Sequence, residues 1–280
     1  MWLAASRWVL FVAYVLLFCT IPFALLWGEI GFAIGGLLTL IVLVTLRHGA
    51  EDKIAKRLGM RLLSPVEAPH VHAITQELSR RLSISTPRIG IIDSPSLNLA
   101  VFGFRSDRYF LAVTQGALSS LGRTELMALI GRQLCWLRTG QVRGESWLSQ
   151  FFAMFDWLAR SSDRMAQGRR LYQYPAFIRQ ILFYPLTLYP AFVLSGHRDG
   201  SALDLRSLKV TRNVRALAEG MRRLEAMAER VPLDPEFSTR HLFLYTSVAT
   251  DPLARVFFGE AGFGKRIDAV EELTQVVAQS

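Results

Sequence analysis

The hydrophobic pattern begins with two uncharged apolar runs that follow one another directly. The first extends from Trp8 to Trp27 and the second from Ile30 to Leu46, with Gly28 and Glu29 between them. About 20 residues are enough to cross the hydrocarbon layer of a bilayer as a helix, and the second run is near the lower limit. A cleaved signal peptide is disfavoured, because no small-x-small cleavage motif follows and a second apolar run does. Residues 1–50 are therefore predicted to form a transmembrane helical hairpin.

Basic residues are concentrated beside this predicted hairpin. Arg7 precedes it and Glu29 lies at its turn. The basic residues that follow it are Arg47, Lys53, Lys56, Arg57 and Arg61. Because Lys and Arg are enriched on the cytoplasmic side of membrane proteins, both ends of the hairpin are predicted to face the cytoplasm. The main domain, residues 51–280, is then expected on the cytoplasmic side too.

Two later apolar segments form a predicted insertion at 147–196. Trp147 to Ala159 is too short to span a bilayer, and Gln180 to Gly196 contains two prolines. If both crossed, the arginine-rich connector between them would lie outside, against the charge rule. We expect this insertion to dip into or lie on the cytoplasmic leaflet, with its arginines at anionic headgroups. A buried core hairpin is the alternative.

From position 51 onward the pattern changes to shorter periodic segments. Apolar residues recur at helical spacing before Leu82, and short apolar runs typical of strands follow. A long apolar helix then begins near Thr124 and ends before Gly140. In chain order the predicted elements are a helix at 65–82, strands at 88–92, 97–104 and 109–113, and helices at 123–139 and 216–231. This order predicts an α+β domain, mainly helical with a small sheet.

The composition fits a membrane protein. Apolar residues make up 51% of the chain, and the net charge is +9. Basic patches with interleaved aromatics indicate nucleic-acid binding, whereas basic residues beside apolar spans indicate a membrane surface. The apolar runs decide for a lipid bilayer as partner and against nucleic acid. The two cysteines, Cys19 and Cys135, do not indicate a disulfide framework.

A glycine-rich segment near the end of the chain fits one nucleotide-binding pattern. Gly259 to Lys265 matches GxxxxGK, but Arg266 stands where a Ser or Thr would hold magnesium. Too few residues follow to build the parallel sheet that such a loop requires. We predict no nucleotide binding, and instead a loop before a helix at 265–278.

Three segments occur in an informative order. They are PRIGIIDSPSLNLAVFGF at 87–104, YFLAVTQGALSSLGRTELMALIGRQLCWLRTGQ at 109–141 and HRDGSALDLRSLK at 197–209. The first two resemble the edge strand and the HExxH helix of the HtpX-type membrane zinc metallopeptidases, and the third resembles the segment with their third zinc ligand. The resemblance extends over nearly the whole chain. It implies a zincin-type domain in the bacterial inner membrane, with zinc as the family cofactor.

The sequence departs from this family at the positions of the chemistry. An HExxH helix places two His one turn apart on one face, with the Glu beside them as general base. The matching positions hold Arg132, Gln133 and Trp136, and the third ligand matches Asp199. Guanidinium and indole groups have no lone pair for a metal, and an amide is not a base. Because a catalytic zinc needs about three protein ligands, the resemblance implies a catalytically inactive pseudopeptidase.

A relocated metal site is the alternative that keeps the chain an active zinc metalloendopeptidase. Its candidate ligands are Cys135, His197 and Asp199. However, Cys135 lies beside the face that Arg132 and Trp136 share, and a free Cys is usually a small buried apolar residue. We therefore expect no cofactor. Without zinc, the Arg132 guanidinium is predicted to pair with the Asp199 carboxylate.

The resemblance also predicts a binding groove. In such peptidases an extended polypeptide adds beside the edge strand above the HExxH helix, through main-chain hydrogen bonds that do not need zinc. The matching groove residues are Asn98, Ala100, Phe102 and Phe104. The predicted function is to hold a polypeptide or a membrane-protein partner, such as an active homologue, in regulation or quality control. A structural membrane component with a filled cleft is the second alternative, which the bulk of Trp136 suggests.

Overall fold

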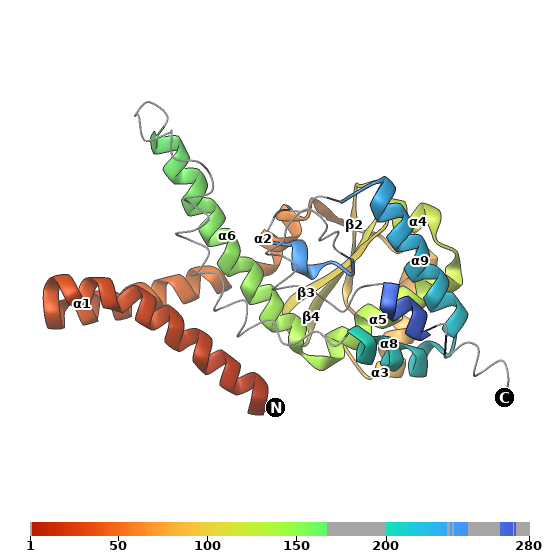
Figure 1. The fold of residues 1–280 in the computed structure, drawn as a ribbon, viewed down its shortest axis with the longest axis horizontal. Coiled ribbons are helices and arrows are strands. Elements are labelled where there is room, and N and C mark those ends of the chain that lie inside the picture. The colour runs from red at the N-terminus through yellow and green to blue at the C-terminus, as the bar shows by residue number, and fades with distance from the viewer. Residues whose placement is uncertain are drawn as a thin grey trace. The chain divides into compact units, whose positions relative to one another are not determined.

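The computed structural model describes residues 2–166, 200–233, 236, 238–245, 264–270 and 272. The chain divides into two compact units, Met1–Ala50 with Trp147–Gly196, and Glu51–Ser146 with His197–Ser280. Figure 1 shows their elements. The predicted apolar segment 180–196, the loop at 259–263 and the candidate ligands His197 and Asp199 lie outside the described residues.

The first unit is built on one long apolar helical segment, α1 (Trp2–Arg47). Its helical geometry is broken at Trp27 and Gly28, and Gly28 has a φ of 55°. After the break, Gly31 lies against the backbone of Phe23, and Gly35 lies against the backbone of Thr20. A Cβ at either glycine would collide with that backbone, so the two halves of α1 approach closely because both residues lack a side chain.

α1 also presents large apolar side chains to its surroundings. Leu25 is 81% exposed and Ile30 is 70% exposed. Within the described residues, one helical stretch, Val9–Arg47, is long and apolar enough to cross a membrane. An exposed apolar surface of this extent on a helix is typical of a membrane or partner contact.

The part of α6 (Gln141–Ala166) that belongs to this unit, from Trp147 onward, packs on α1. The Phe11 ring meets the Phe151 ring edge to face, with 5.5 Å between their centroids. Gln150 Nε2 donates a hydrogen bond of 2.6 Å to the carbonyl oxygen of Ala50. The predicted apolar segment 147–159 thus lies in a helix whose first turns pack against α1.

The second unit contains a four-stranded mixed sheet in the order β1-β2-β4-β3. β2 and β4 are parallel, and the other neighbours are antiparallel. The strands are β1 (Met60–Leu62), β2 (Arg88–Ile92), β3 (Leu99–Arg105) and β4 (Arg108–Thr114). The three predicted strands are confirmed, and β3 lies at an edge. β1 was not predicted, because three residues are too few for an alternating pattern.

Helices pack around this sheet, and the chain is mainly helical, as expected. They are α2 (Ala50–Arg57), α3 (Pro69–Leu82), α4 (Gln115–Ser120), α5 (Arg123–Thr139), α8 (Gly200–Thr211), α9 (Val214–Arg230) and the short 3₁₀ helix η2 (Arg240–Leu242). The helices predicted at 65–82, 123–139 and 216–231 correspond to α3, α5 and α9. Residues 264–270 are helical too, within the helix predicted at 265–278.

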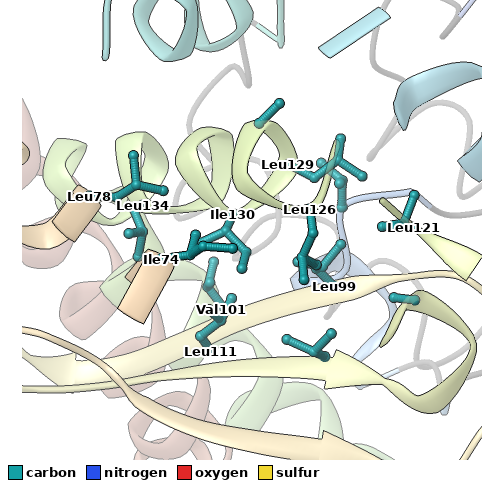
Figure 2. Close-up of a cluster of buried hydrophobic side chains, with 14 of the residues drawn as sticks. Ile74, Leu78, Leu99, Val101, Leu111, Leu121, Leu126, Leu129, Ile130 and Leu134 are labelled. Carbon is teal, nitrogen blue, oxygen red and sulfur yellow. The ribbon is translucent and has the colours of Figure 1, made fainter. Parts of the chain in front are cut away.

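α5 is the centre of the second unit, and it contacts β3, α3, α8 and α9. Figure 2 shows Leu126 and Ile130 of α5 pointing toward Leu99 and Val101 of β3. On another face, a Cβ at Gly131 would lie 2.6 Å from a methyl carbon of Thr211, so α8 approaches α5 at this glycine. Burial of α5 on several faces places its polar residues in the interior.

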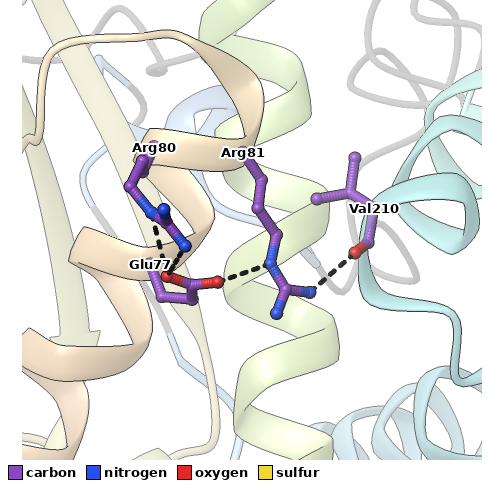
Figure 3. A network of polar contacts seen from close by, with 4 residues as sticks. All are labelled: Glu77, Arg80, Arg81 and Val210. Carbon is purple, nitrogen blue, oxygen red and sulfur yellow. Dashed lines mark hydrogen bonds and ion pairs between the residues drawn. The ribbon is translucent and has the colours of Figure 1, made fainter.

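A surface network joins α3 to α8 (Figure 3). The Glu77 carboxylate accepts hydrogen bonds from Arg80 and Arg81, and Arg81 Nη1 donates to the Val210 carbonyl oxygen at 3.1 Å. Because these side chains are exposed, their ion pairs contribute little to stability. The buried contacts of α5 therefore hold this part of the fold together.

Candidate functional site

The candidate site lies on α5, whose ends are well defined. At its start, the Glu125 carboxylate accepts a hydrogen bond of 2.8 Å from the Gly122 N–H. At its end, Gly140 adopts a left-handed conformation with a φ of 74°. Between these ends the two polar residues Arg132 and Gln133 are 1% and 0% exposed. Both positions of the predicted chemistry are therefore enclosed.

Arg132 pairs with a carboxylate on α8. Its Nε donates to Asp204 Oδ1 at 2.6 Å. The same carboxylate also accepts two hydrogen bonds from Arg266. Arg266 Nε donates to Asp204 Oδ2 at 2.9 Å, and Nη2 donates to Oδ1 at 2.9 Å. All three side chains are at most 2% exposed. Charge-assisted hydrogen bonds of this length are strong, and they join α5, α8 and the helix at 264–270.

Gly200 makes room for this cluster of Arg132, Asp204 and Arg266. A Cβ at Gly200 would lie 2.8 Å from Cζ and from Nε of Arg266. The guanidinium therefore lies directly against the α8 backbone. Sequence reasoning missed Arg266 as a site residue, because its partner is 62 positions away and no local spacing links them.

The position that the resemblance matches to the general base holds an amide bonded to the sheet. Gln133 Nε2 donates a hydrogen bond of 3.1 Å to the Leu99 carbonyl oxygen of β3. Its Oε1 has no hydrogen-bond partner among the described residues. Beside it, the Trp136 indole is 1% exposed. An amide that donates to the sheet and a buried indole provide neither a base nor a metal ligand.

Of the three predicted ligands of a relocated metal site, only Cys135 lies in the part of the chain that the structure describes. Burial raises the pKa of the Cys135 thiol to about 11, against the opposing effect of nearby arginines. The thiolate form that binds metals is therefore disfavoured. The pairing predicted between Arg132 and Asp199 involves a residue outside the described ones, and Asp204 accepts from Arg132. No group of three or more His, Cys, Asp or Glu side chains that could hold a metal occurs within the described residues.

A zinc ion does not fit the side chains at this helix. The family's chemistry needs imidazoles at the positions of Arg132 and Trp136, where this chain has a cation engaged by Asp204 and a buried indole. A second cation, Arg266, already occupies the remaining carboxylate oxygen. Placing a divalent ion here would bring like charges together.

The predicted groove residues line the edge strand, and all of them are buried. Asn98, Ala100, Phe102 and Phe104 are 2%, 0%, 0% and 7% exposed. The structure places Ala100, Phe102 and Phe104 on β3 and Asn98 directly before it. It does not leave that edge open, however. A second part of the chain covers it.

The cover is made by η2 and the residues that follow it. The Leu244 N–H donates to the Leu99 carbonyl oxygen at 2.7 Å, and Phe243 pairs with Ala100 in an isolated antiparallel bridge. The Asn98 side chain donates to the Tyr245 carbonyl oxygen at 2.7 Å and accepts from the Tyr245 N–H at 3.3 Å. These contacts occupy the Leu99 carbonyl oxygen and the edge position at Ala100, which an added strand would use.

Two further contacts flank this covered edge. Beyond the bridge, the Gly103 N–H donates to Ser146 Oγ of α6 at 2.8 Å. His241 Nε2 lies 2.9 Å from the Glu145 carbonyl oxygen and 3.8 Å from Glu145 Oε2. Sequence analysis did not predict either contact.

Comparison with known proteins finds relatives that cover most of the chain. No family model matches the chain. Among curated proteins, the chain is 28% identical to the Protease HtpX homolog of Nostoc punctiforme over 80% of this chain and 81% of that protein. It is 24% identical to the Salinibacter ruber homolog over 90% and 92%, and 27% identical to the Acaryochloris marina homolog over 90% and 88%.

These similarities support the HtpX-like family and are consistent with a member of a membrane protease family. They extend across both compact units. They agree with the resemblance carried by the three sequence segments, and with the apolar helix at the start of the chain.

Proposed function

We propose that this chain is an HtpX-like pseudopeptidase, a membrane-anchored member of the family that does not hydrolyse peptide bonds. One observation carries the proposal. Arg132, at the first ligand position of the HExxH pattern, is buried and bonded to Asp204 at 2.6 Å. A guanidinium held in this way donates hydrogen bonds and provides no lone pair for zinc.

The remaining chemistry of a metallopeptidase is also missing from these positions. The reaction of the family requires a metal-bound water and a base that takes its proton. Gln133 is an amide bonded to Leu99, and Trp136 is an indole. An active zinc metalloendopeptidase would need ligands from elsewhere in the chain, with Cys135, His197 and Asp199 as the remaining candidates.

We also propose that α1 crosses the bacterial inner membrane as a hairpin with its turn at Trp27 and Gly28. The exposed apolar side chains of α1 and the close approach at Gly31 and Gly35 support this arrangement. The basic residues after Arg47 favour a cytoplasmic position for the second unit.

For the binding function, we propose that the β3 edge holds an extended polypeptide or a membrane-protein partner, in regulation or quality control. Main-chain recognition at a sheet edge does not depend on zinc. The alternative is a structural membrane component with a filled cleft. The burial of Trp136 and the cover over β3 favour this alternative.

The proposed loss of activity is tested with purified full-length chain in detergent. We expect no cleavage of an unfolded reporter such as casein with added zinc, while the Nostoc punctiforme homolog serves as the active control. Cleavage by this chain that a zinc chelator abolishes would overturn the pseudopeptidase proposal.

A further inference from the structure

The cover over β3 resembles a short bound peptide. We call residues Arg240–Tyr245 the covering segment. It reaches β3 from 147 positions away in the sequence and adds an antiparallel partner at Ala100. Its Leu244 N–H bonds the Leu99 carbonyl, which is the type of contact that an added polypeptide strand makes.

The covering segment pairs with β3 much less extensively than β4 does on the other side. β4 pairs with β3 from Leu99 to Arg105, whereas the covering segment makes one isolated bridge, at Phe243. A single bridge leaves fewer ladder hydrogen bonds to be broken than the full pairing of β3 with β4. Displacement of the covering segment would leave the pairing of β3 with β4 in place.

We infer that an extended apolar polypeptide binds the β3 edge by displacing the covering segment. This inference rests on the proposed binding function at the β3 edge, and it adds the segment that competes with the ligand and the chemistry of the ligand. The segment Asn98 to Val101 is the exchangeable part of the edge, because farther along Gly103 is already bonded to Ser146.

The covering segment indicates the chemistry of the ligand. Leu242, Phe243 and Leu244 are at most 3% exposed. The residue opposite Ala100 is a phenylalanine, so the small Ala100 side chain faces a large ring across the bridge. A competing polypeptide therefore needs apolar or aromatic residues and a free N–H at the position of Leu244. Unfolded or membrane-derived segments have this character.

The Asn98 side chain recognises the backbone of the segment that lies beside β3, and not the side chains of that segment. It bonds both the N–H and the carbonyl of Tyr245, so it reads the peptide unit of any extended residue placed there. The site accordingly recognises an extended apolar segment with loose sequence preference.

The test uses a fluorescent peptide with the sequence of the covering segment, RHLFLY, and the full-length chain in detergent. A second peptide, RHLFPY, lacks the N–H that corresponds to Leu244. Binding is followed by anisotropy. We expect RHLFLY to bind at least about tenfold more tightly than RHLFPY, because one main-chain hydrogen bond and the extended geometry are lost.

A disulfide that holds the covering segment on β3 provides the decisive variant. Facing residues at a bridge of this kind lie about 4.5 Å apart at Cα, within disulfide range. Ala100→Cys combined with Phe243→Cys is therefore expected to crosslink on oxidation and to abolish RHLFLY binding. Reduction of the same sample should restore it, so each preparation is its own control for folding.

A second variant and a second measurement keep the test informative if the double-cysteine variant does not fold. Leu244→Pro removes the donor to Leu99 and should increase RHLFLY affinity on the order of tenfold, because more of the edge is open. In the wild-type chain, saturating RHLFLY should speed hydrogen exchange at residues 242–245. This measurement needs no substitution.

The outcomes separate the two proposals. Equal binding of RHLFLY by the crosslinked and the reduced forms would mean that the peptide binds elsewhere. It would contradict displacement of the covering segment and leave the proposed polypeptide binding intact. No binding by any form, including Leu244→Pro, overturns both and favours the filled structural cleft. Loss on oxidation with recovery on reduction supports both.

Discussion

α1 and α5 reverse the usual positions of apolar and charged residues. α1 exposes large apolar side chains such as Leu25 and Ile30, whereas α5 encloses Arg132 and Gln133. Neither arrangement is stable in isolation. Exposed apolar surface requires a lipid or protein partner, and a buried charge requires an opposite charge.

The difference lies in where each helix finds its partner. α5 finds it within the unit, because Asp204 receives both Arg132 and Arg266. α1 buries part of its surface on α6 through Phe11 and leaves the rest exposed. The buried charges of α5 are therefore paired within their own unit, whereas the exposed apolar face of α1 depends on a lipid or protein partner.

The largest expected effect comes from breaking the buried pair in the second unit. Asp204→Asn would leave two buried guanidinium groups without their carboxylate. We expect it to lower the free energy of unfolding by about 3–5 kcal/mol, measured by urea unfolding in detergent followed by circular dichroism. Asp268→Asn, an exposed position on the helix of Arg266, should change it by less than about 0.5 kcal/mol. Equal effects would contradict the role of the cluster.

The next largest effect concerns the exposed face of α1. Leu17→Arg and Leu37→Arg each replace a leucine that is more than half exposed. If this face meets lipid, each should cost about 2.5–3.5 kcal/mol in membrane insertion and reduce the fraction that resists carbonate extraction. Val66→Arg, at an 89% exposed position of the second unit, is the matched control and should have no effect. Unchanged extraction of all three would argue against a membrane-spanning α1.

A smaller effect is expected at Gly200. An alanine Cβ there would force the Arg266 guanidinium away from the α8 backbone. Overpacking of this kind typically costs about 1–3 kcal/mol, and thermal unfolding of Gly200→Ala measures it. Gly264→Ala is the control, because its Cβ would meet no atom within 4 Å. A stable Gly200→Ala variant would show that the cluster tolerates rearrangement.

The smallest effect is a pH dependence at Cys135. The thiol pKa rises from 9.0 to about 11 in the folded chain. Between these values the unfolded chain loses this proton while the folded chain keeps it, so stability should fall as pH rises. Cys135→Ala should show a shallower decline of unfolding free energy over the same range. Identical slopes would mean that the thiol is not held in this way.

Local sequence patterns predicted the secondary structure well but could not predict the site. The boundaries of α5, from Arg123 to Thr139, follow from helical periodicity and terminal residues that act within a few positions. The pairing of Arg132 with Asp204 joins residues 72 positions apart, and the cover on Asn98 joins residues 147 positions apart. Such contacts depend on tertiary packing.

The sequence pattern located the edge strand correctly at 97–104 but gave no sign of its occupancy. Alternation identifies which residues lie on a strand, and it is silent on what lies beside the strand. The covering segment contributes a single bridge at Phe243, which is too short for an alternating pattern to reveal.

The most direct test of the account is the zinc content of the purified wild-type chain, measured by mass spectrometry after dialysis against a mild chelator. The account predicts far less than one zinc per chain, because Arg132, Gln133 and Trp136 leave no ligand set on α5. A tightly held zinc at about one per chain would contradict it.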